Sequence, residues 1–348
     1  MARRPTAQER QIAALLQQFQ PQVRKAFIDA MRTAATAVDR AALIRALEAR
    51  DISLAMEILR MNQQALFPMG EAVRAAYLQG GASVAASLPV AIRGQFGFGG
   101  NPRAVEAVQR IVGQAIEGVT AESLEATRGY ITQAVADGVP PRRMALEITG
   151  RSGRSGAPRT GGIMGLNSNQ TDAVIRARAE LLTGDFAAYK RREGRVGGRN
   201  RSLDRLITRA QKEGRPLTAA EVDAMVDAYK SRLLNLRGEM IARTETLNAL
   251  RAGQHDGFAT LIDSGAVTAD RLTVTWQATA DARTRDAHTA LGGTTIRFGE
   301  LFQSPAGGLL AHPGDTAHGA GPADLVACRC AAVYRILTPQ QLAERAAQ

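Results

Sequence analysis

Apolar residues recur at every third or fourth position through the first part of the chain. Ile12, Leu15, Leu16 and Phe19 share one face of a helix at this spacing, and the same period continues through residues 43–61. A period near 3.6 residues is typical of amphipathic helices whose apolar face packs on a core. The pattern predicts helices over residues 6–88.

Residues 94–102 interrupt this pattern with glycines and a proline. Such clusters mark loops, and we expect Phe96 and Phe98 to anchor this loop to another surface. The helical period resumes at Pro102, a residue favoured in the first turn of a helix, and it is seen again over residues 120–136. Helices are therefore expected on both sides of one apolar loop.

Helical patterns also dominate the middle of the chain. A short helix is expected over residues 142–148 and a mobile basic glycine-rich loop over residues 150–165, before a further helix. Thr218 and Glu221 have the spacing of a capping box, in which each side chain bonds the backbone N–H of the other. A long helix is predicted to start there and to continue to about residue 250.

The pattern changes near residue 265. Residues 272–278 alternate between apolar and polar and are rich in β-branched side chains, which predicts a strand, and residues 294–298 and 331–336 predict two more. The fold class is therefore α+β, predominantly α-helical, with a long helical N-terminal and central region followed by a small α+β C-terminal domain with a short sheet. The predicted regions are a helical region 1–140, a basic glycine-rich linker 141–164, a central helical region 165–264 and the small α+β domain 265–340.

Positive charge is concentrated in the middle of the chain. The formal net charge is +11, and residues 142–215 hold 17 lysines and arginines against 7 acidic residues, a net of +10. Such a cluster suits phosphate-backbone contact, which is non-specific and salt-dependent, or contact with an acidic protein. The alternative is an arginine-rich face that water solvates. The candidate contact residues are Arg151, Arg154, Arg159, Lys190, Arg191, Arg192, Arg195, Arg199 and Arg201.

The two cysteines, Cys328 and Cys330, are separated by one residue near the C-terminus. With His288 they form a candidate zinc site, because thiolate and imidazole are ligands that zinc prefers. A fourth zinc ligand would come from His312, His318, Asp281 or Asp315. Buried thiols are the alternative, because cysteine also behaves as a small apolar residue, and a redox role is a third interpretation.

Charged residues flank this candidate zinc site. Arg243 and Glu245 lie two apart on the predicted long helix, so they point to different faces and pair with something outside it. We expect a polar clasp in which Glu245 pairs with Arg283 or Arg285, and Asp281 pairs with Arg243. This clasp is interpreted as a structural brace, and the alternative is a site for a small anion or a partner carboxylate.

Targeting signals are not evident in the sequence. The first residues do not form the apolar core of a signal peptide, and no run approaches the ~20 apolar residues needed to span a bilayer. We expect a cytosolic chain with reduced thiols and without membrane contact. No phosphate-binding loop of the Gly-x-x-x-x-Gly-Lys-Ser/Thr type is present, which argues against a packaging motor.

Five short motifs, with a tryptophan among them, occur in an order that resembles the phage head morphogenesis proteins, the minor head proteins similar to phage Mu protein F and to its counterpart in phage SPP1. They are residues 241–246 with 249–253, Trp276, Asp281-x-Arg283-Thr284-Arg285-x-x-His288, residues 291–293, Pro313-Gly314-Asp315 and Cys328-Arg329-Cys330. The resemblance covers about residues 165–337. His312 and Ala327 depart from it, since many members have Asn where Ala327 stands.

The resemblance implies a minor capsid protein of a tailed phage or prophage that acts in procapsid assembly at the portal, in contact with packaged DNA, or in both. The implied partners are the portal protein, other capsid or scaffold proteins and packaged DNA. The implied location is the virion head, with the host cytoplasm during assembly. No enzymatic activity is established for the family as a whole. The alternatives are a metal-dependent enzyme or toxin-like effector delivered with the genome, and a non-specific DNA-binding module.

Overall fold

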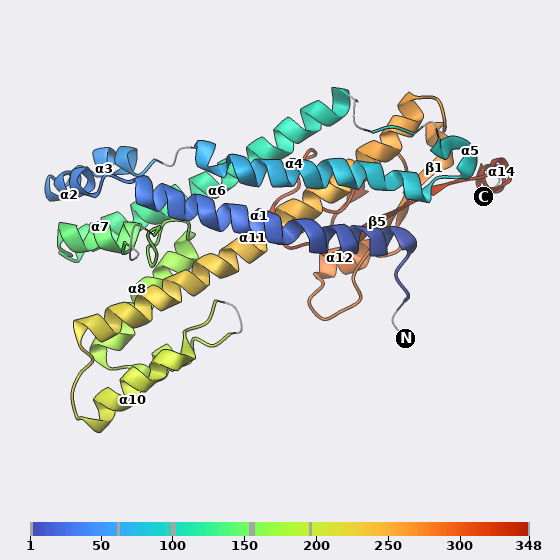
Figure 1. The fold of residues 1–348 in the computed structure, drawn as a ribbon. Helices are drawn as coiled ribbons and strands as arrows, with labels where there is room; N and C mark the ends of the chain where they lie inside the picture. The colour runs from blue at the N-terminus through green and yellow to red at the C-terminus, as the bar shows by residue number, and fades with distance from the viewer. Residues whose placement is uncertain are drawn as a thin grey trace. The chain divides into compact units, whose positions relative to one another are not determined.

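A computed structural model gives the fold of the chain and describes residues 3–60, 63–94, 96–98, 102–152, 157–194 and 197–346 (Figure 1). The chain divides into two compact units built from interleaved segments. Unit 1 comprises Met1–Arg24, Met69–Ala115 and Met240–Gln348, and unit 2 comprises Lys25–Pro68 and Ile116–Glu239. The division into four consecutive regions, 1–140, 141–164, 165–264 and 265–340, stays a prediction.

Helices occupy most of the first half of the chain, as the apolar period predicts. The helices are α1 (Ala7–Ala37), α2 (Arg40–Glu48), α3 (Ile52–Ile58), η1 (Gln63–Leu66), α4 (Phe67–Ala82), η2 (Ser83–Ser87), α5 (Val90–Arg93) and α6 (Pro102–Ala136). Pro102 is the first residue of α6, and the two helical patterns expected after it form one helix. Phe98 is buried beside Tyr77, so this part of the apolar loop is anchored as expected.

The middle of the chain is also helical. Its elements are α7 (Pro141–Thr149), α8 (Ser168–Thr183), α9 (Phe186–Lys190), η4 (Arg201–Leu203), α10 (Asp204–Lys212) and α11 (Ala219–Asp263). The capping box before α11 is confirmed, because the Thr218 N–H donates to Glu221 over 2.8 Å and the Glu221 N–H donates to Thr218 over 3.3 Å. α11 continues to Asp263, about three turns beyond the predicted end.

A small antiparallel sheet in unit 1 confirms the three predicted strands. β1 (Leu272–Gln277) lies between β2 (Thr295–Arg297) and β5 (Ala331–Ile336), with Val274 opposite both Ile296 and Tyr334. In this C-terminal region, the elements that the sequence did not predict are η5 (Ala269–Arg271), α12 (Asp286–Leu291), β3 (Phe302–Gln303), β4 (Leu309–Leu310), α13 (Pro322–Leu325) and α14 (Pro339–Ala346). The α+β class, predominantly helical with a short C-terminal sheet, is confirmed.

The outer edge of β5 is covered by a side chain from α1. The Gln8 side-chain amide donates to the Tyr334 carbonyl over 2.8 Å, and the Tyr334 N–H donates to the Gln8 side-chain oxygen over 2.9 Å. Gln8 therefore bonds both backbone groups of Tyr334, as a neighbouring strand would, and satisfies polar groups that an edge strand otherwise leaves open.

Unit 1 encloses its core between the sheet and the C-terminal half of α11. Trp276 is fully buried, as its place in an alternating strand predicts, and it meets the rings of Phe302 and His288 edge-on at 5.3 and 5.4 Å. Phe258 of α11 stacks on Tyr334 of β5 at 4.4 Å. Burial of such large aromatic side chains is a main source of stability in a small domain.

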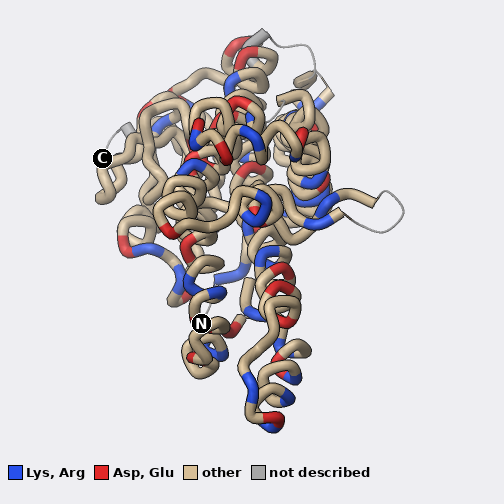
Figure 2. The backbone as a smooth tube through the Cα atoms, turned by 90° about the vertical axis from the view of Figure 1, so that its left-hand side faces the viewer, with Lys and Arg blue, Asp and Glu red and all other residues tan. Residues whose placement is uncertain are grey.

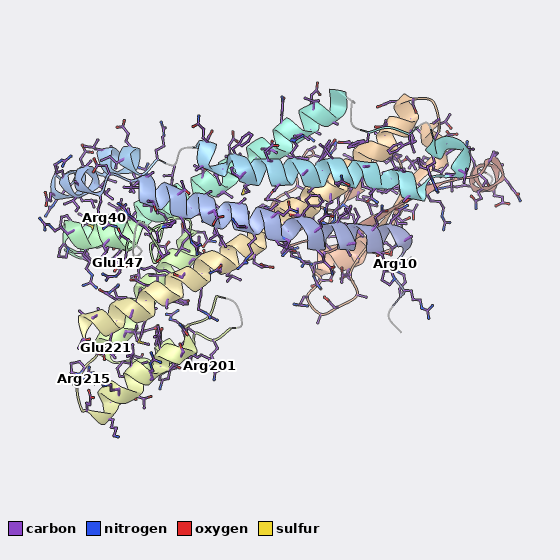
Figure 3. The ribbon with its side chains drawn as sticks, in the orientation of Figure 1. Arg10, Arg40, Glu147, Arg201, Arg215 and Glu221 are labelled. Atoms are coloured by element: carbon purple, nitrogen blue, oxygen red, sulfur yellow. The ribbon has the colours of Figure 1, made fainter. Side chains whose placement is uncertain are left out.

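Unit 2 contains a buried network of opposite charges. The Lys230 ammonium of α11 is 1% exposed and bonds Glu147 of α7, Asp227 and the Gly161 carbonyl. Glu147 also accepts from Arg178 of α8. Figure 3 labels Glu147. Because a buried charge is costly unless it is paired, this network joins three helices through specific partners.

Candidate functional site

Three potential metal ligands meet in unit 1. His288 lies on α12, and Cys328 and Cys330 lie in the segment that leads into β5. The sulfur atoms of both cysteines lie 3.6 Å from Nδ1 of His288, and the three donor atoms are all within 4.8 Å of one another. All three residues are 1–2% exposed. The structure therefore brings together the three residues that the sequence singled out, and we call them the Cys-His cluster.

The other ring nitrogen of His288 faces a carboxylate. Nε2 lies 3.2 Å from Oδ1 of Asp324, and the Ser304 hydroxyl donates to the same oxygen over 2.6 Å. Asp324 is 1% exposed and lies on α13. The sequence analysis identified neither Asp324 nor Ser304. For Asp324 a signal was present, because a proline followed by an acidic residue is typical of a helix start.

The two thiols differ in their affinity for a proton. The hydrogen bond between them lowers the pKa of Cys328, with further lowering from the Arg251 charge and from His288, whereas it raises the pKa of Cys330. The contact with Cys328 raises the pKa of His288. The cluster therefore favours a thiolate on Cys328 beside a thiol on Cys330.

Residues of α11 hold the cysteine segment in place. Arg251 is buried and donates to the carbonyls of Cys328 and Cys330, while Thr244 accepts from the Ala327 N–H over 3.0 Å. Ala327 has a positive φ of 52°, a conformation that Asn tolerates better than Ala. Thr244 and Arg251, which belong to the motifs 241–246 and 249–253, therefore fix the backbone around the Cys-His cluster.

Two members of the predicted polar clasp, Asp281 and Arg285, contact the segment around the two cysteines. Asp281 forms a two-pronged ion pair with Arg329, the residue between the two cysteines, and this guanidinium holds the pKa of Asp281 well below its usual range. Arg285 donates to the Val326 carbonyl over 2.5 Å, and the Arg283 N–H donates to Asp281 over 2.9 Å. The sequence analysis did not consider Arg329 as a partner of Asp281. Its position between the two cysteines was the feature that could have indicated it.

Arg243 and Glu245 lie on α11, as predicted, on either side of Thr244. The pairing of Glu245 with Arg283 or Arg285, and of Arg243 with Asp281, stays a prediction.

The additional zinc ligands considered from the sequence lie elsewhere. Within the described part of the chain, none of His312, His318, Asp281 and Asp315 belongs to the ligand group of the Cys-His cluster. His318 bonds Asp315 over 2.6 Å, and both line a pocket of about 410 Å³ together with His312. The structure therefore groups three of the candidate residues, His288, Cys328 and Cys330, and places the other four outside that group.

Several predicted nucleic-acid contacts are engaged inside unit 2. Arg151 pairs with Asp223 and Asp227, Arg192 with Glu180, and the buried Arg199 with Asp204. Arg159 donates to the carbonyls of Ala35 and Val38. Arg154 and Arg195 lie outside the described residues. Figure 2 shows lysine and arginine positions interspersed with acidic ones along the backbone.

Exposed cations remain on and beside α10. Arg201, Arg205, Arg209 and Lys212 are exposed at the spacing of one helix face, whereas Ile207 and Ala210 are buried. We call these four residues the α10 basic face. Arg191 is exposed as well and Lys190 is half-buried. In the described ranges, Arg191, Arg201, Arg205 and Lys212 have no ion-pair partner, so their charge is open to an external anion.

The described helices include none with the length and apolar character needed to cross a membrane. Comparison with known proteins finds one family, described as phage Mu protein F like protein, whose model matches residues 202–333. No curated protein and no solved structure matches the chain. This match agrees with the head morphogenesis family that the sequence motifs resemble.

The matched residues include α10, α11, β1, β2, the first half of β5 and the Cys-His cluster, and all five sequence motifs lie within them. Residues 202–333 thus match the model of the phage Mu protein F like family, and the resemblance inferred from the motifs is confirmed over this segment.

Proposed function

We propose that this chain is a minor capsid protein that acts in procapsid assembly at the portal, and that its α10 basic face contacts packaged DNA in the virion head. The family match supports a role in the phage head. The observation that carries the DNA contact is the row of exposed cations on η4 and α10, three of which have no carboxylate partner among the described residues. The proposed partners are the portal protein, other capsid or scaffold proteins and DNA.

The geometry of the α10 basic face favours a polyanion over a single small anion. Arg201, Arg205, Arg209 and Lys212 follow one side of about three helical turns, so their charges form a row and do not converge on one point. Arg201 lies where the chain enters α10, and Arg215 and Glu221 lie together where α10 gives way to α11 (Figure 3). A row of cations is suited to successive phosphates, whose counterions are released on binding.

Salt dependence of DNA binding tests the DNA contact. We expect the full chain to bind duplex DNA with an affinity that falls steeply as salt rises. The double variant R201Q/R205Q should reduce the slope of log affinity against log salt by about 0.9 for each phosphate that the variant no longer neutralises. The matched control is R45Q/R60Q, which removes two exposed arginines elsewhere in unit 2. Equal slopes for the R201Q/R205Q variant and the control would exclude the α10 basic face as the contact.

Association with the portal is tested separately. We expect the purified chain to cosediment with portal assemblies or procapsids at low salt. Failure to associate with either would overturn the assembly role, whereas association that survives R201Q/R205Q would assign the α10 basic face to DNA and the portal contact to another surface.

A further inference from the structure

We propose that His288, Cys328 and Cys330 bind one divalent ion of the zinc class. Two sulfurs and one imidazole nitrogen are donors that select zinc over magnesium or calcium, which prefer oxygen. Within the described residues, this is the group of His, Cys, Asp and Glu side chains whose donor atoms come together closely enough to share an ion. The proposal concerns the Cys-His cluster and does not depend on the proposed DNA contact.

The separations between the donor atoms fit tetrahedral coordination. Zn–S distances of about 2.3 Å and Zn–N distances of about 2.0–2.1 Å at a tetrahedral angle place a sulfur and a nitrogen about 3.6 Å apart. Both sulfurs lie 3.6 Å from Nδ1 of His288. One imidazole N–H cannot point directly at two sulfurs, whereas one ion between the three atoms contacts all of them. The symmetric arrangement therefore favours a shared ion.

Asp324 orients the imidazole for this task. Its carboxylate lies 3.2 Å from Nε2 and is itself fixed by the Ser304 hydroxyl. An acceptor on Nε2 retains the proton there, so the lone pair of Nδ1 points toward the two sulfurs. A carboxylate on the far nitrogen of a metal-binding histidine is a common arrangement, because it fixes the ring and strengthens the ligand.

The backbone around the cysteines is also fixed. Arg251 bonds the carbonyls on both sides of Arg329, and Thr244 bonds the N–H of Ala327. Both cysteine side chains are buried, so water competes poorly for the ion. Three protein ligands leave one position of a tetrahedral ion for a small external donor.

Metal content of the full chain tests the proposal. The chain is purified under reducing conditions, stripped with a chelator, supplied with Zn²⁺ or Co²⁺ and separated from free ion. We expect one ion per chain and, with Co²⁺, the near-ultraviolet absorption of thiolate-to-cobalt charge transfer. Retention of no more ion than the C328S/C330S variant retains would overturn the proposal.

A second variant keeps all three donor atoms. D324N removes the charge behind His288, and we expect it to weaken metal affinity by about 10- to 100-fold. The matched control, H318Q, alters a histidine of the same unit that lies outside the ligand group and should leave the affinity unchanged. Circular dichroism establishes that each variant is folded. Equal affinity in D324N and H318Q would contradict the orienting role assigned to Asp324.

Discussion

A Cβ atom on Gly253 would lie 1.9 Å from the carbonyl oxygen of Tyr77. α11 and α4 therefore approach each other backbone to backbone at this point of unit 1, and a Cβ on Gly80 would likewise lie 2.1 Å from the carbonyl oxygen of Leu250. The glycine that ends the motif 249–253 is required by this helix crossing. No hydrogen bond or ligand contact is needed to explain it.

Replacing Gly253 by alanine should therefore destabilise unit 1. We expect G253A to lower the free energy of unfolding by about 1–3 kcal/mol, because overpacking forces the helices apart. Denaturant unfolding followed by circular dichroism measures the change. The matched control is G113A on α6, where a Cβ meets nothing within 4 Å and helix propensity alone should add about 0.5–1 kcal/mol. If G253A raised the free energy of unfolding as G113A does, α4 and α11 would not be in close contact at Gly253.

Loss of the Glu147 charge should destabilise unit 2. E147Q leaves the buried Lys230 ammonium and Arg178 without one of their carboxylates, and removing one partner of a buried pair costs about 3–5 kcal/mol. Thermal and denaturant unfolding provide the measurement. E213Q is the control, because Glu213 is an exposed partner of Arg209 and Arg215 and exposed pairs contribute little. Indistinguishable midpoints for E147Q and the wild type would contradict the network.

The left-handed conformation of Ala327 predicts a stabilising substitution. An L-residue with a Cβ is disfavoured there by roughly 1–2 kcal/mol. Glycine removes this strain but adds backbone entropy to the unfolded chain, so A327G should raise the free energy of unfolding by about 0.5–1 kcal/mol. The control is A323G on α13, where the same change removes a helix former and should lower stability. A lower unfolding midpoint for A327G would show that the Ala327 Cβ makes contacts that outweigh the strain.

The pair Arg215–Glu221 predicts a specific pH dependence. The Arg215 guanidinium lowers the pKa of Glu221 to about 2. A depressed pKa means that the stabilising contact is fully present above the unfolded pKa of about 4.3 and is lost as pH falls toward 2. The stability difference between wild type and E221Q should therefore shrink over this pH range.

NMR titration of the Glu221 carboxyl carbon measures the pKa directly. R215Q should return it toward the ordinary value for glutamate, and high salt should do so in part because solvent reaches the half-buried pair. A pKa for Glu221 that is unaffected by R215Q would assign the depression to the Thr218 N–H.

Periodicity was sufficient to predict the helices and the three longer strands, because each buries one repeating face. It could not predict α12 or α13, since helices of four to six residues carry less than two periods. The Cys-His cluster was recognised from residue type, but Asp324 and Arg251 were not, because their roles depend on segments that meet only after folding. The count of charge over residues 142–215 overstated the free charge, since Asp223 and Asp227, which pair with Arg151, lie outside that window.

The bond between Gln8 and Tyr334 joins residues 326 positions apart. Contacts of such long sequence separation form slowly, because closing the intervening loop has a large entropic cost. Until α1 docks, the outer edge of β5 presents unpaired backbone groups that can recruit a strand from another chain. Residues 202–348 produced alone would keep β5 but lack Gln8, and the resulting open edge would make that fragment prone to self-association during refolding.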